Sequence, residues 1–327
     1  MIKALKNFAE LTRAYSLGAS LAPYFVAFCW AFVSEFYAID AVLSLVAVVF
    51  LHLGFNLYDD FIDVILKLQK GERLSEINFD GGKEKARLII NGTFPLIAVC
   101  AIIFALFSIA SVIGVYFYIL HGTTVLKIAA LTAFLGLIYP ISAKFYLSEI
   151  IISLIFGVLL TKGVYLAITG WSSTNLFLFS IALALIITPI AHVHSIMDWE
   201  FDEKNNKHTL ARLCSTKKNA VTALGVMICG AYLILGVMIA LNYVPPLMLV
   251  TFLTAPIGFE LVKSADDYIN MVDVEFKPRW WFGPMENWAH IKQAGNAFFM
   301  YRFYLARNLA TSFAVIAGLS YAVAVGF

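Results

Sequence analysis

Residues 41–63 read AVLSLVAVVFLHLGFNLYDDFID, an apolar run of membrane length that ends in a cluster of acidic side chains. Carboxylates beside such a run are costly to place, so they usually serve a function. Positions 56, 59, 60 and 63 recur at i, i+3, i+4 and i+7, a spacing that gathers side chains on one helical face. These positions hold Asn56, Asp59, Asp60 and Asp63. The stretch therefore predicts a membrane helix with an oxygen-rich face near one end.

The composition of the whole chain agrees with this interpretation. Of the 327 residues, 61% are hydrophobic and 13% are charged, and the mean hydropathy is +0.84. Soluble domains carry about 25% charged residues, so the composition indicates an integral membrane protein. Apolar runs near the ~20 residues that a spanning helix needs predict an all-α bundle of about nine transmembrane helices. The runs lie at 14–34, 40–64, 94–118, 124–141, 149–170, 175–197, 218–240, 246–263 and 308–326.

The basic residues are distributed unevenly between the two sides of this topology. With the N-terminus on the cytoplasmic side, all of the 23 lysines and arginines except Lys127 and Lys162 fall in cytoplasmic segments. This agrees with the positive-inside rule and predicts that the acidic runs face the cytoplasm at the cell (inner) membrane. The basic residues cluster at helix ends and form no stripe, so nucleic acid binding is not supported. The expected surroundings are membrane lipids.

A second acidic run, Asp198-Trp-Glu200-Phe-Asp202, follows the sixth apolar run. Asp198 and Asp202 are four positions apart and share a helical face, whereas Glu200 points away from them. Two carboxylate clusters suit Mg²⁺, which prefers oxygen ligands and commonly binds together with substrate phosphates. A Mg²⁺–diphosphate would also relieve the repulsion among these carboxylates. The expected Mg²⁺ ligands are Asn56, Asp59, Asp60, Asp63, Asp198 and Asp202.

Basic residues follow each acidic run along the chain. Lys83 and Arg87 lie in the loop after the first run, and Lys207 follows Asp202 by five positions. Ammonium and guanidinium groups bind phosphate oxygens, so these three residues are candidate diphosphate ligands. The same residues also satisfy the positive-inside rule, and the sequence does not separate the two explanations.

The two acidic runs and a third element form a set of motifs. The third element is Tyr139-Pro140-Ile-Ser-Ala-Lys144, near the end of the fourth apolar run. The second run continues into a tail with Lys207, Thr209 and Leu210. In these features the chain resembles the UbiA-type intramembrane prenyltransferases, although Asn206 replaces a glycine of the family pattern. The resemblance covers all nine runs and implies one domain over residues 1–327, with a bundle of nine transmembrane helices around a central cavity.

The resemblance also implies a reaction. A prenyl chain would move from an allylic polyprenyl diphosphate to an aromatic or lipid acceptor, with Mg²⁺ as cofactor. Asp60, Asp63 and Asp198 would act in ionisation of the diphosphate, and Lys144 would join the diphosphate ligands. An allylic cation is stabilised by aromatic faces, and Tyr139 is the best-placed candidate for this role.

Within the family, the dihydroxynaphthoate (menaquinone) branch is the most similar. Phe79-Asp80-Gly81-Gly82 and Leu147-Ser148-Glu149 resemble that branch, but His194 and Met197 stand where it usually has Asn and Arg. His194 and the intramembrane Lys162 are candidate acceptor contacts, although Lys162 could instead extend to the membrane interface. The expected acceptor is 1,4-dihydroxy-2-naphthoate. The alternatives are a terpene cyclase, transfer to a non-aromatic lipid acceptor and, from another class, an ion-coupled transporter.

The last long connection differs in composition from the others. Residues 264–306 are expected to form a cytoplasmic loop, and this loop contains Trp280, Trp281 and Trp288. Tryptophans favour the headgroup region of a membrane, so we expect an interfacial helix over residues 285–298.

Overall fold

The computed structural model describes residues 2–77 and 86–326, and these residues form helices joined by turns, with no strand among them. In this part of the chain, nine helical segments, some of them made of two or three consecutive elements, are long and apolar enough to cross a membrane. The all-α class and the nine spans predicted from the sequence are therefore confirmed. The spans are Ala14–Phe32, Ala38–Gln69, Leu96–His121, Thr123–Ser142, Ser148–Thr169, Thr174–Met197, Lys217–Ala240, Pro246–Ile269 and Ala297–Gly326.

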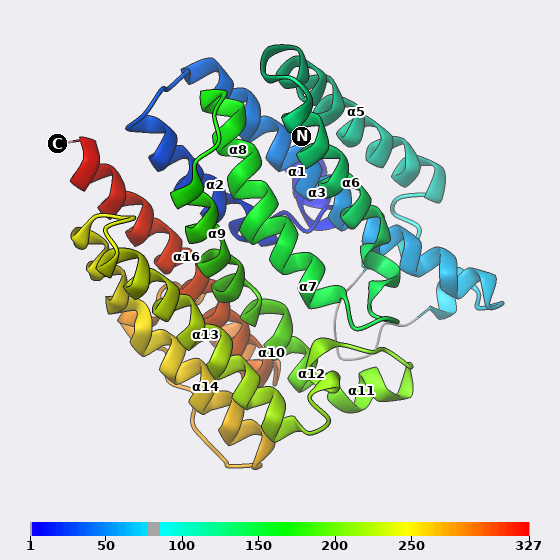
Figure 1. Ribbon diagram of the computed structural model, residues 1–327. Helices are drawn as coiled ribbons and strands as arrows, with labels where there is room; N and C mark the ends of the chain where they lie inside the picture. The colour runs from blue at the N-terminus through cyan, green and yellow to red at the C-terminus, as the bar shows by residue number, and fades with distance from the viewer. Residues whose placement is uncertain (1, 78–85, 327) are drawn as a thin grey trace.

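Several spans consist of more than one element, and short helices connect them (Figure 1). The first six spans contain η1 (Ala14–Ser16) with α2 (Gly18–Phe32), α3 (Ala38–Gln69), α5 (Leu96–His121), α6 (Thr123–Ser142), α7 (Ser148–Ile152) with η3 (Ser153–Leu159) and α8 (Leu160–Thr169), and α9 (Thr174–Ile187) with α10 (Pro189–Met197). The last three contain α13 (Lys217–Ala240), η4 (Pro246–Thr254) with α14 (Ala255–Ile269), and α16 (Ala297–Gly326). The connecting elements are α1 (Ile2–Leu11), η2 (Leu74–Glu76), α4 (Arg87–Ile90), α11 (Trp199–Lys204), α12 (Leu210–Leu213), η5 (Trp280–Phe282) and α15 (Trp288–Gln293).

The second span, α3, is longer than the apolar run that predicted it. It continues from Asp63 to Gln69 without interruption, so the first acidic cluster lies inside the helix and not at its end. Leu57 and Val64 on this helix are fully buried. The helix therefore packs against its neighbours at the level of the acidic residues, which fixes the direction of their side chains.

The fifth and sixth spans are irregular where they meet. A π-helical segment, η3, interrupts the fifth span, and a Cβ built on its Gly157 would lie 2.3 Å from Cα of Ala184 in α9. Only glycine allows this backbone approach. Pro189 begins α10 because proline lacks the N–H that would continue α9, and it is well tolerated at a first helical position. A π-helical turn inside an α-helix is rare and is often found at functional sites.

The connection before the last span is shorter than the expected loop. Because α14 continues to Ile269 and α16 begins at Ala297, it covers residues 270–296 and not 264–306. The interfacial helix expected over 285–298 is also too long, since α15 covers Trp288–Gln293. Trp281 and Trp288 pack on the protein core, whereas Trp280 is exposed. Two of the three tryptophans thus contribute to the packing of the protein interior.

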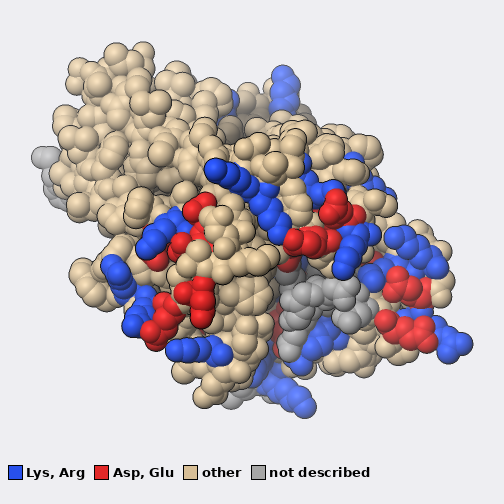
Figure 2. All heavy atoms as spheres, turned by 90° about the horizontal axis from the view of Figure 1, so that it is seen from below, with Lys and Arg blue, Asp and Glu red and all other residues tan. Residues whose placement is uncertain are grey.

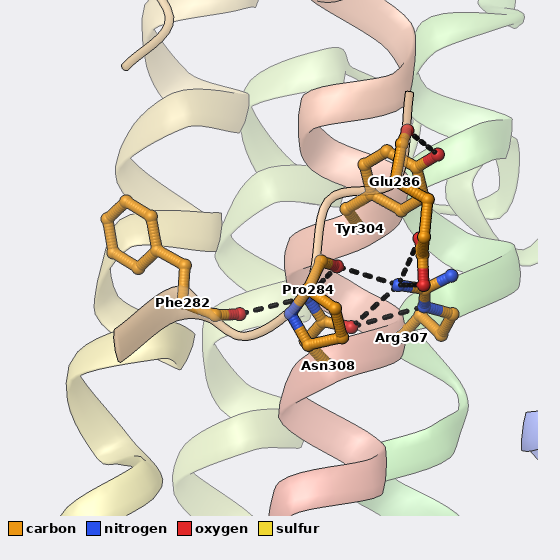
Figure 3. A network of polar contacts seen from close by, with 6 residues as sticks. All are labelled: Phe282, Pro284, Glu286, Tyr304, Arg307 and Asn308. Carbon is orange, nitrogen blue, oxygen red and sulfur yellow. Dashed lines mark hydrogen bonds and ion pairs between the residues drawn. The ribbon is translucent and has the colours of Figure 1, made fainter. Parts of the chain in front are cut away.

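Polar contacts hold this connection on α16 (Figure 3). Asn308 donates to the carbonyl oxygens of Phe282 and Pro284 at 2.9 Å. Arg307 lies 3.0 Å from Glu286, and the Tyr304 hydroxyl donates to the backbone carbonyl of Glu286. The segment thereby fixes α16, which carries Phe303 to the centre of the molecule.

The outer surface of the bundle is largely apolar, as a lipid environment requires. On α5, Ile97, Phe104 and Val112 are each at least 70% exposed. Charged side chains of both signs gather on one part of the face in Figure 2, beside a broad region without them. The molecule therefore has a polar end and apolar flanks.

Candidate functional site

A cavity of about 420 Å³ lies between the spans, as the resemblance implied. Four of the sequence-predicted site residues line it, and they come from α3, α6 and α10. They are Asn56, Asp59, Tyr139 and His194. Most of the other lining side chains are apolar, including Val48, Ile128 and Phe156. The cavity therefore joins the first acidic motif to a long apolar wall.

An arginine ahead of the first span pairs with two carboxylates of the first acidic motif. Nη1 of Arg13 lies 2.9 Å from Oδ1 of Asp60 and 3.4 Å from Oδ2 of Asp59. Arg13 has a left-handed backbone (φ 52°), which turns the chain between α1 and η1. Burial opposes the charge, but the attraction of Asp60 and Asp59 prevails and raises the pKa of the Arg13 guanidinium. This ion pair brings the N-terminal segment to the motif.

The amide of Asn56 has a fixed orientation. Its nitrogen donates to the Thr12 carbonyl oxygen at 3.2 Å and to Oγ of Ser16 at 2.9 Å. Ser16 also hydrogen-bonds Nε2 of His52 at 2.8 Å, and Ser20 hydrogen-bonds Nδ1 of the same ring at 2.6 Å. Both hydrogens of the amide are thus used, which leaves its oxygen as the atom available to a cation.

The second acidic motif lies at a helix break and not on a continuous helix. Asp198 ends α10 and precedes α11, with backbone angles of φ −90° and ψ 15°. The N–H of Asp202 still donates to the carbonyl oxygen of Asp198 at 2.8 Å, so the expected four-residue spacing is retained. The next turn is closed by Lys207, whose N–H donates to the Asp202 carbonyl oxygen at 2.8 Å.

A buried carboxylate holds both ends of this motif. Glu149, at the start of α7, is 1% exposed. Its Oε1 accepts from the Ser195 hydroxyl at 3.0 Å, and its Oε2 accepts from the Leu210 N–H at 3.0 Å and the Ser148 hydroxyl at 2.6 Å. Ser195 precedes Asp198 by three positions and Leu210 follows the motif, so one side chain ties both flanks to the fifth span. A buried carboxylate without such donors would be strongly unfavourable.

Of the predicted diphosphate ligands, the three that the structure describes are not among the residues that line the cavity. Lys83 is outside the described residues. Nε of Arg87 donates to Glu10 of α1 at 3.0 Å, and Lys144 is exposed at the end of α6. Lys207 is also exposed, with its Nζ 5.4 Å from the ring centre of Phe201. The structure therefore places Arg87, Lys144 and Lys207 at the surface of the protein.

The two candidate acceptor contacts have different surroundings. His194 stacks between Phe299 and Phe303 of α16, with ring centres 4.7 and 5.2 Å away. Lys162 is not among the cavity-lining residues, and its Nζ lies over the ring of Phe177 at 5.3 Å. The structure brings His194 to the cavity and does not bring Lys162 there, because Lys162 turns toward α9.

The described residues contain no ready metal cluster: no three histidine, cysteine or carboxylate side chains in them lie close enough together to hold an ion. The six expected ligands are nevertheless all oxygen donors, and Asp59, Asp60 and Asp202 are buried. An oxygen-only set fits Mg²⁺. The magnesium site remains a prediction.

Three residues of this site were not among the predicted site residues: Arg13, His52 and Glu149. The resemblance to the family includes Leu11-Thr12-Arg13 and Leu147-Ser148-Glu149, but neither Arg13 nor Glu149 was assigned a role in the site. His52 lies one helical turn before Asn56 on the same face, and this spacing could have identified it. Glu149 had no sequence signal for its partners, because Ser195 and Leu210 are brought to it only by the packing of separate spans.

Comparisons with known proteins agree with this fold. The model of a family described as the UbiA prenyltransferase family matches residues 20–270. The apo structure of a UbiA homolog from Aeropyrum pernix K1 is similar with a TM-score of 0.63 and 18% identity, covering 92% of this chain and 96% of that one. A structure of a digeranylgeranylglyceryl phosphate synthase is similar with a TM-score of 0.61 and 16% identity, covering 99% of each chain. A comparison with curated protein sequences finds no match.

Proposed function

The chain belongs to the UbiA prenyltransferase family, and on that premise we propose that it transfers a prenyl chain from an allylic polyprenyl diphosphate to 1,4-dihydroxy-2-naphthoate, as in menaquinone biosynthesis. One observation carries the proposal. The cavity begins at the oxygen-rich face of Asn56 and Asp59 and continues between apolar walls. This arrangement suits a substrate with an anionic head and an apolar tail.

The headgroup would bind at the polar end. Asn56, Asp59, Asp60, Asp63, Asp198 and Asp202 would hold Mg²⁺, and Lys207, Lys144, Arg87 and Lys83 would contact the diphosphate. When bound, Mg²⁺ neutralises the leaving diphosphate and so assists cleavage of the allylic C–O bond. Arg13 already pairs with Asp59 and Asp60, and its guanidinium would turn to phosphate oxygens when a cation takes over these carboxylates.

The chemistry of transfer would take place inside the cavity. The C–O bond of the donor breaks, and diphosphate leaves with the electron pair. A ring carbon of the acceptor then forms a bond to C1 of the prenyl chain. The carboxylate on that carbon leaves as CO₂, and its electron pair restores the aromatic ring. Tyr139 would face the allylic cation, and the apolar walls would keep water from it.

The acceptor would bind near α10. His194 and Phe303 line the cavity one to two turns from Asp198 and the start of α16, and their rings would offer aromatic surface to a flat acceptor. Lys162 is not included in this proposal, since its ammonium group lies over Phe177 outside the cavity lining. We further propose that the protein resides in the cell (inner) membrane with both acidic motifs facing the cytoplasm, on the basis of its charge distribution.

A reconstituted assay tests the proposal. The protein in nanodiscs would receive Mg²⁺ and geranylgeranyl diphosphate, with and without dihydroxynaphthoate, and released diphosphate and lipid products would be measured. We expect a prenylated, decarboxylated product only with the acceptor, and loss of turnover with a chelator. Turnover that persists in the chelator would reject metal-assisted ionisation. Diphosphate release with a hydrocarbon or alcohol product, independent of the acceptor, would identify a terpene cyclase.

A second candidate acceptor is a prenylated glyceryl phosphate. The solved digeranylgeranylglyceryl phosphate synthase, whose fold covers the whole chain, motivates this alternative. The same assay with geranylgeranylglyceryl phosphate in place of the naphthoate separates the two acceptors. A product formed only with the glyceryl lipid would replace the first proposal. That reaction forms a prenyl ether and releases no CO₂, so the two products are distinguishable.

A further inference from the structure

The cavity is long in the direction of the spans. On α3 its lining residues extend from Asp59 to Ser44, fifteen positions away. A helix rises 1.5 Å per residue, so this wall is about 22 Å long. The polar atoms of the first motif lie at one end, and the opposite end is lined mainly by apolar side chains beside Ser44. A tail that starts at the motif would therefore run along α3 toward the far side of the bundle.

Gly114 lies in the wall of the distant part. On α5 the cavity is lined by Ala110, Gly114 and Phe117, which recur at i, i+4 and i+7 and so share one face. Phe117 and Ala47 of α3 belong to one packing cluster, and Tyr116 donates to Asp40 near the start of α3, which places this region beside the first half of α3. Ala47 is twelve positions from Asp59, about 18 Å along the helix. Gly114 therefore lies deep in the cavity, remote from the chemistry.

The space beside Gly114 is open. A Cβ built on Gly114 meets no atom within 4 Å. The other two glycines of the cavity wall differ, because a Cβ on Gly136 would lie 2.4 Å from the Phe55 ring and a Cβ on Gly163 would lie 3.2 Å from Ile128. Glycine lowers the stability of a helix by about 1 kcal/mol relative to alanine, and at position 114 no neighbouring atom excludes a larger side chain. Helix packing therefore does not explain the glycine at this position.

We propose that Gly114 determines the longest donor tail that the cavity accepts. A long prenyl tail would pass the open face of α5 at Gly114, whereas a short tail would end nearer the acidic motif. A large side chain at position 114 would fill this passage and exclude only the long donors. This inference rests on the proposed function, because it takes the tail of the diphosphate donor to occupy the cavity.

The test compares donors of different length in Gly114→Phe and wild type. Geranyl, farnesyl and geranylgeranyl diphosphate would be supplied with the same acceptor, and kcat/KM would be measured for each. We expect the ratio of geranylgeranyl to geranyl kcat/KM to fall at least tenfold, with geranyl turnover retained. Val112→Phe adds the same ring on the exposed face of α5 and should leave the ratio unchanged. An unchanged ratio in folded Gly114→Phe would overturn the proposal.

Two further measurements keep the test decisive. Gly114→Val gives a smaller block if the phenylalanine variant does not fold, and it should reduce the ratio in the same direction. Binding of the same three diphosphates without acceptor, measured by calorimetry, does not depend on turnover. If wild type turned over no donor, the proposed function would fail, while the calorimetric length preference would still decide the role of Gly114. If the variant preferred short over long donors no more than wild type does, the proposed role of Gly114 would be rejected.

Discussion

The two acidic motifs present similar side chains in different ways. The first lies within an uninterrupted helix, α3, and Arg13 from the N-terminal segment forms ion pairs with two of its aspartates. The second lies at the break between α10 and α11, and Glu149 of another span holds its flanks. A continuous helix positions its own side chains, whereas a helix end depends on contacts from elsewhere. The second motif should therefore be the more sensitive to changes outside it.

The largest effect should come from the acidic residues themselves. Asp60→Asn and Asp198→Asn keep the shape of the side chain but remove the charge that a metal–diphosphate requires. We expect each to lower kcat more than about 100-fold. Mutation of residues that only hydrogen-bond metal ligands already lowers metal affinity or activity about 10–100-fold. Glu200→Gln is the control, because Glu200 is exposed and pairs with Lys217. Near-normal turnover in either aspartate variant would refute the requirement for two motifs.

Glu149→Gln tests the dependence of the second motif on its tether. The amide keeps the volume but replaces an accepting oxygen with a donor, so one of the three hydrogen bonds is lost. We expect about a 10–100-fold loss of turnover and a higher Mg²⁺ concentration for half-maximal activity. Ser195→Ala in the same protein should add little, because both changes break one network. Additive effects would indicate that Ser195 and Glu149 act independently. Glu203→Gln, on the exposed side of α11, is the control.

Two glycine variants compare the packing behind the motifs. Gly157→Ala would force a methyl group against the backbone of Ala184, which cannot move alone. Gly54→Ala would meet the Phe107 side chain at 2.7 Å, and a side chain can rotate away. We expect Gly157→Ala to cost about 1–3 kcal/mol, the range for overpacked cores, and Gly54→Ala to cost less. Thermal unfolding midpoints in the same detergent measure both. A larger loss of stability in Gly54→Ala would show that the contact of Gly54 with Phe107 is the more rigid of the two.

The smallest effect is expected at His52, which acts on the first motif through Ser16. His52→Phe removes both serine hydrogen bonds and loosens the orientation of the Asn56 amide. Only the Ser16 contact leads on to Asn56, and one hydrogen bond contributes about 1 kcal/mol, so we expect roughly a fivefold loss of turnover. His290→Phe, on α15, is the matched control. A loss as large as that of Asp60→Asn would show that the helix alone does not position Asn56.

Most of the fold could be predicted because each span carries its own signal. Apolar length predicted the nine spans, and helical spacing predicted the shared face of Asn56 and Asp60. Boundaries were less accurate where polar residues continue a helix, as they do from Asp63 to Gln69. The break at Asp198 was missed because the four-residue spacing of Asp198 and Asp202 is equally compatible with an unbroken helix.

Local features follow directly from the order of the residues: the membrane class, the spans, the acidic motifs and their spacing. The packing of the spans selects which distant groups meet these motifs. Arg13 reaches Asp60, and Glu149 reaches Ser195 and Leu210, only because separate spans pack side by side. It also decided that Lys162 lies over Phe177 and that Gly114 borders an open space. Hydrophobicity and periodicity are properties of neighbouring residues, whereas charge compensation and cavity shape arise from contacts between residues far apart in the chain.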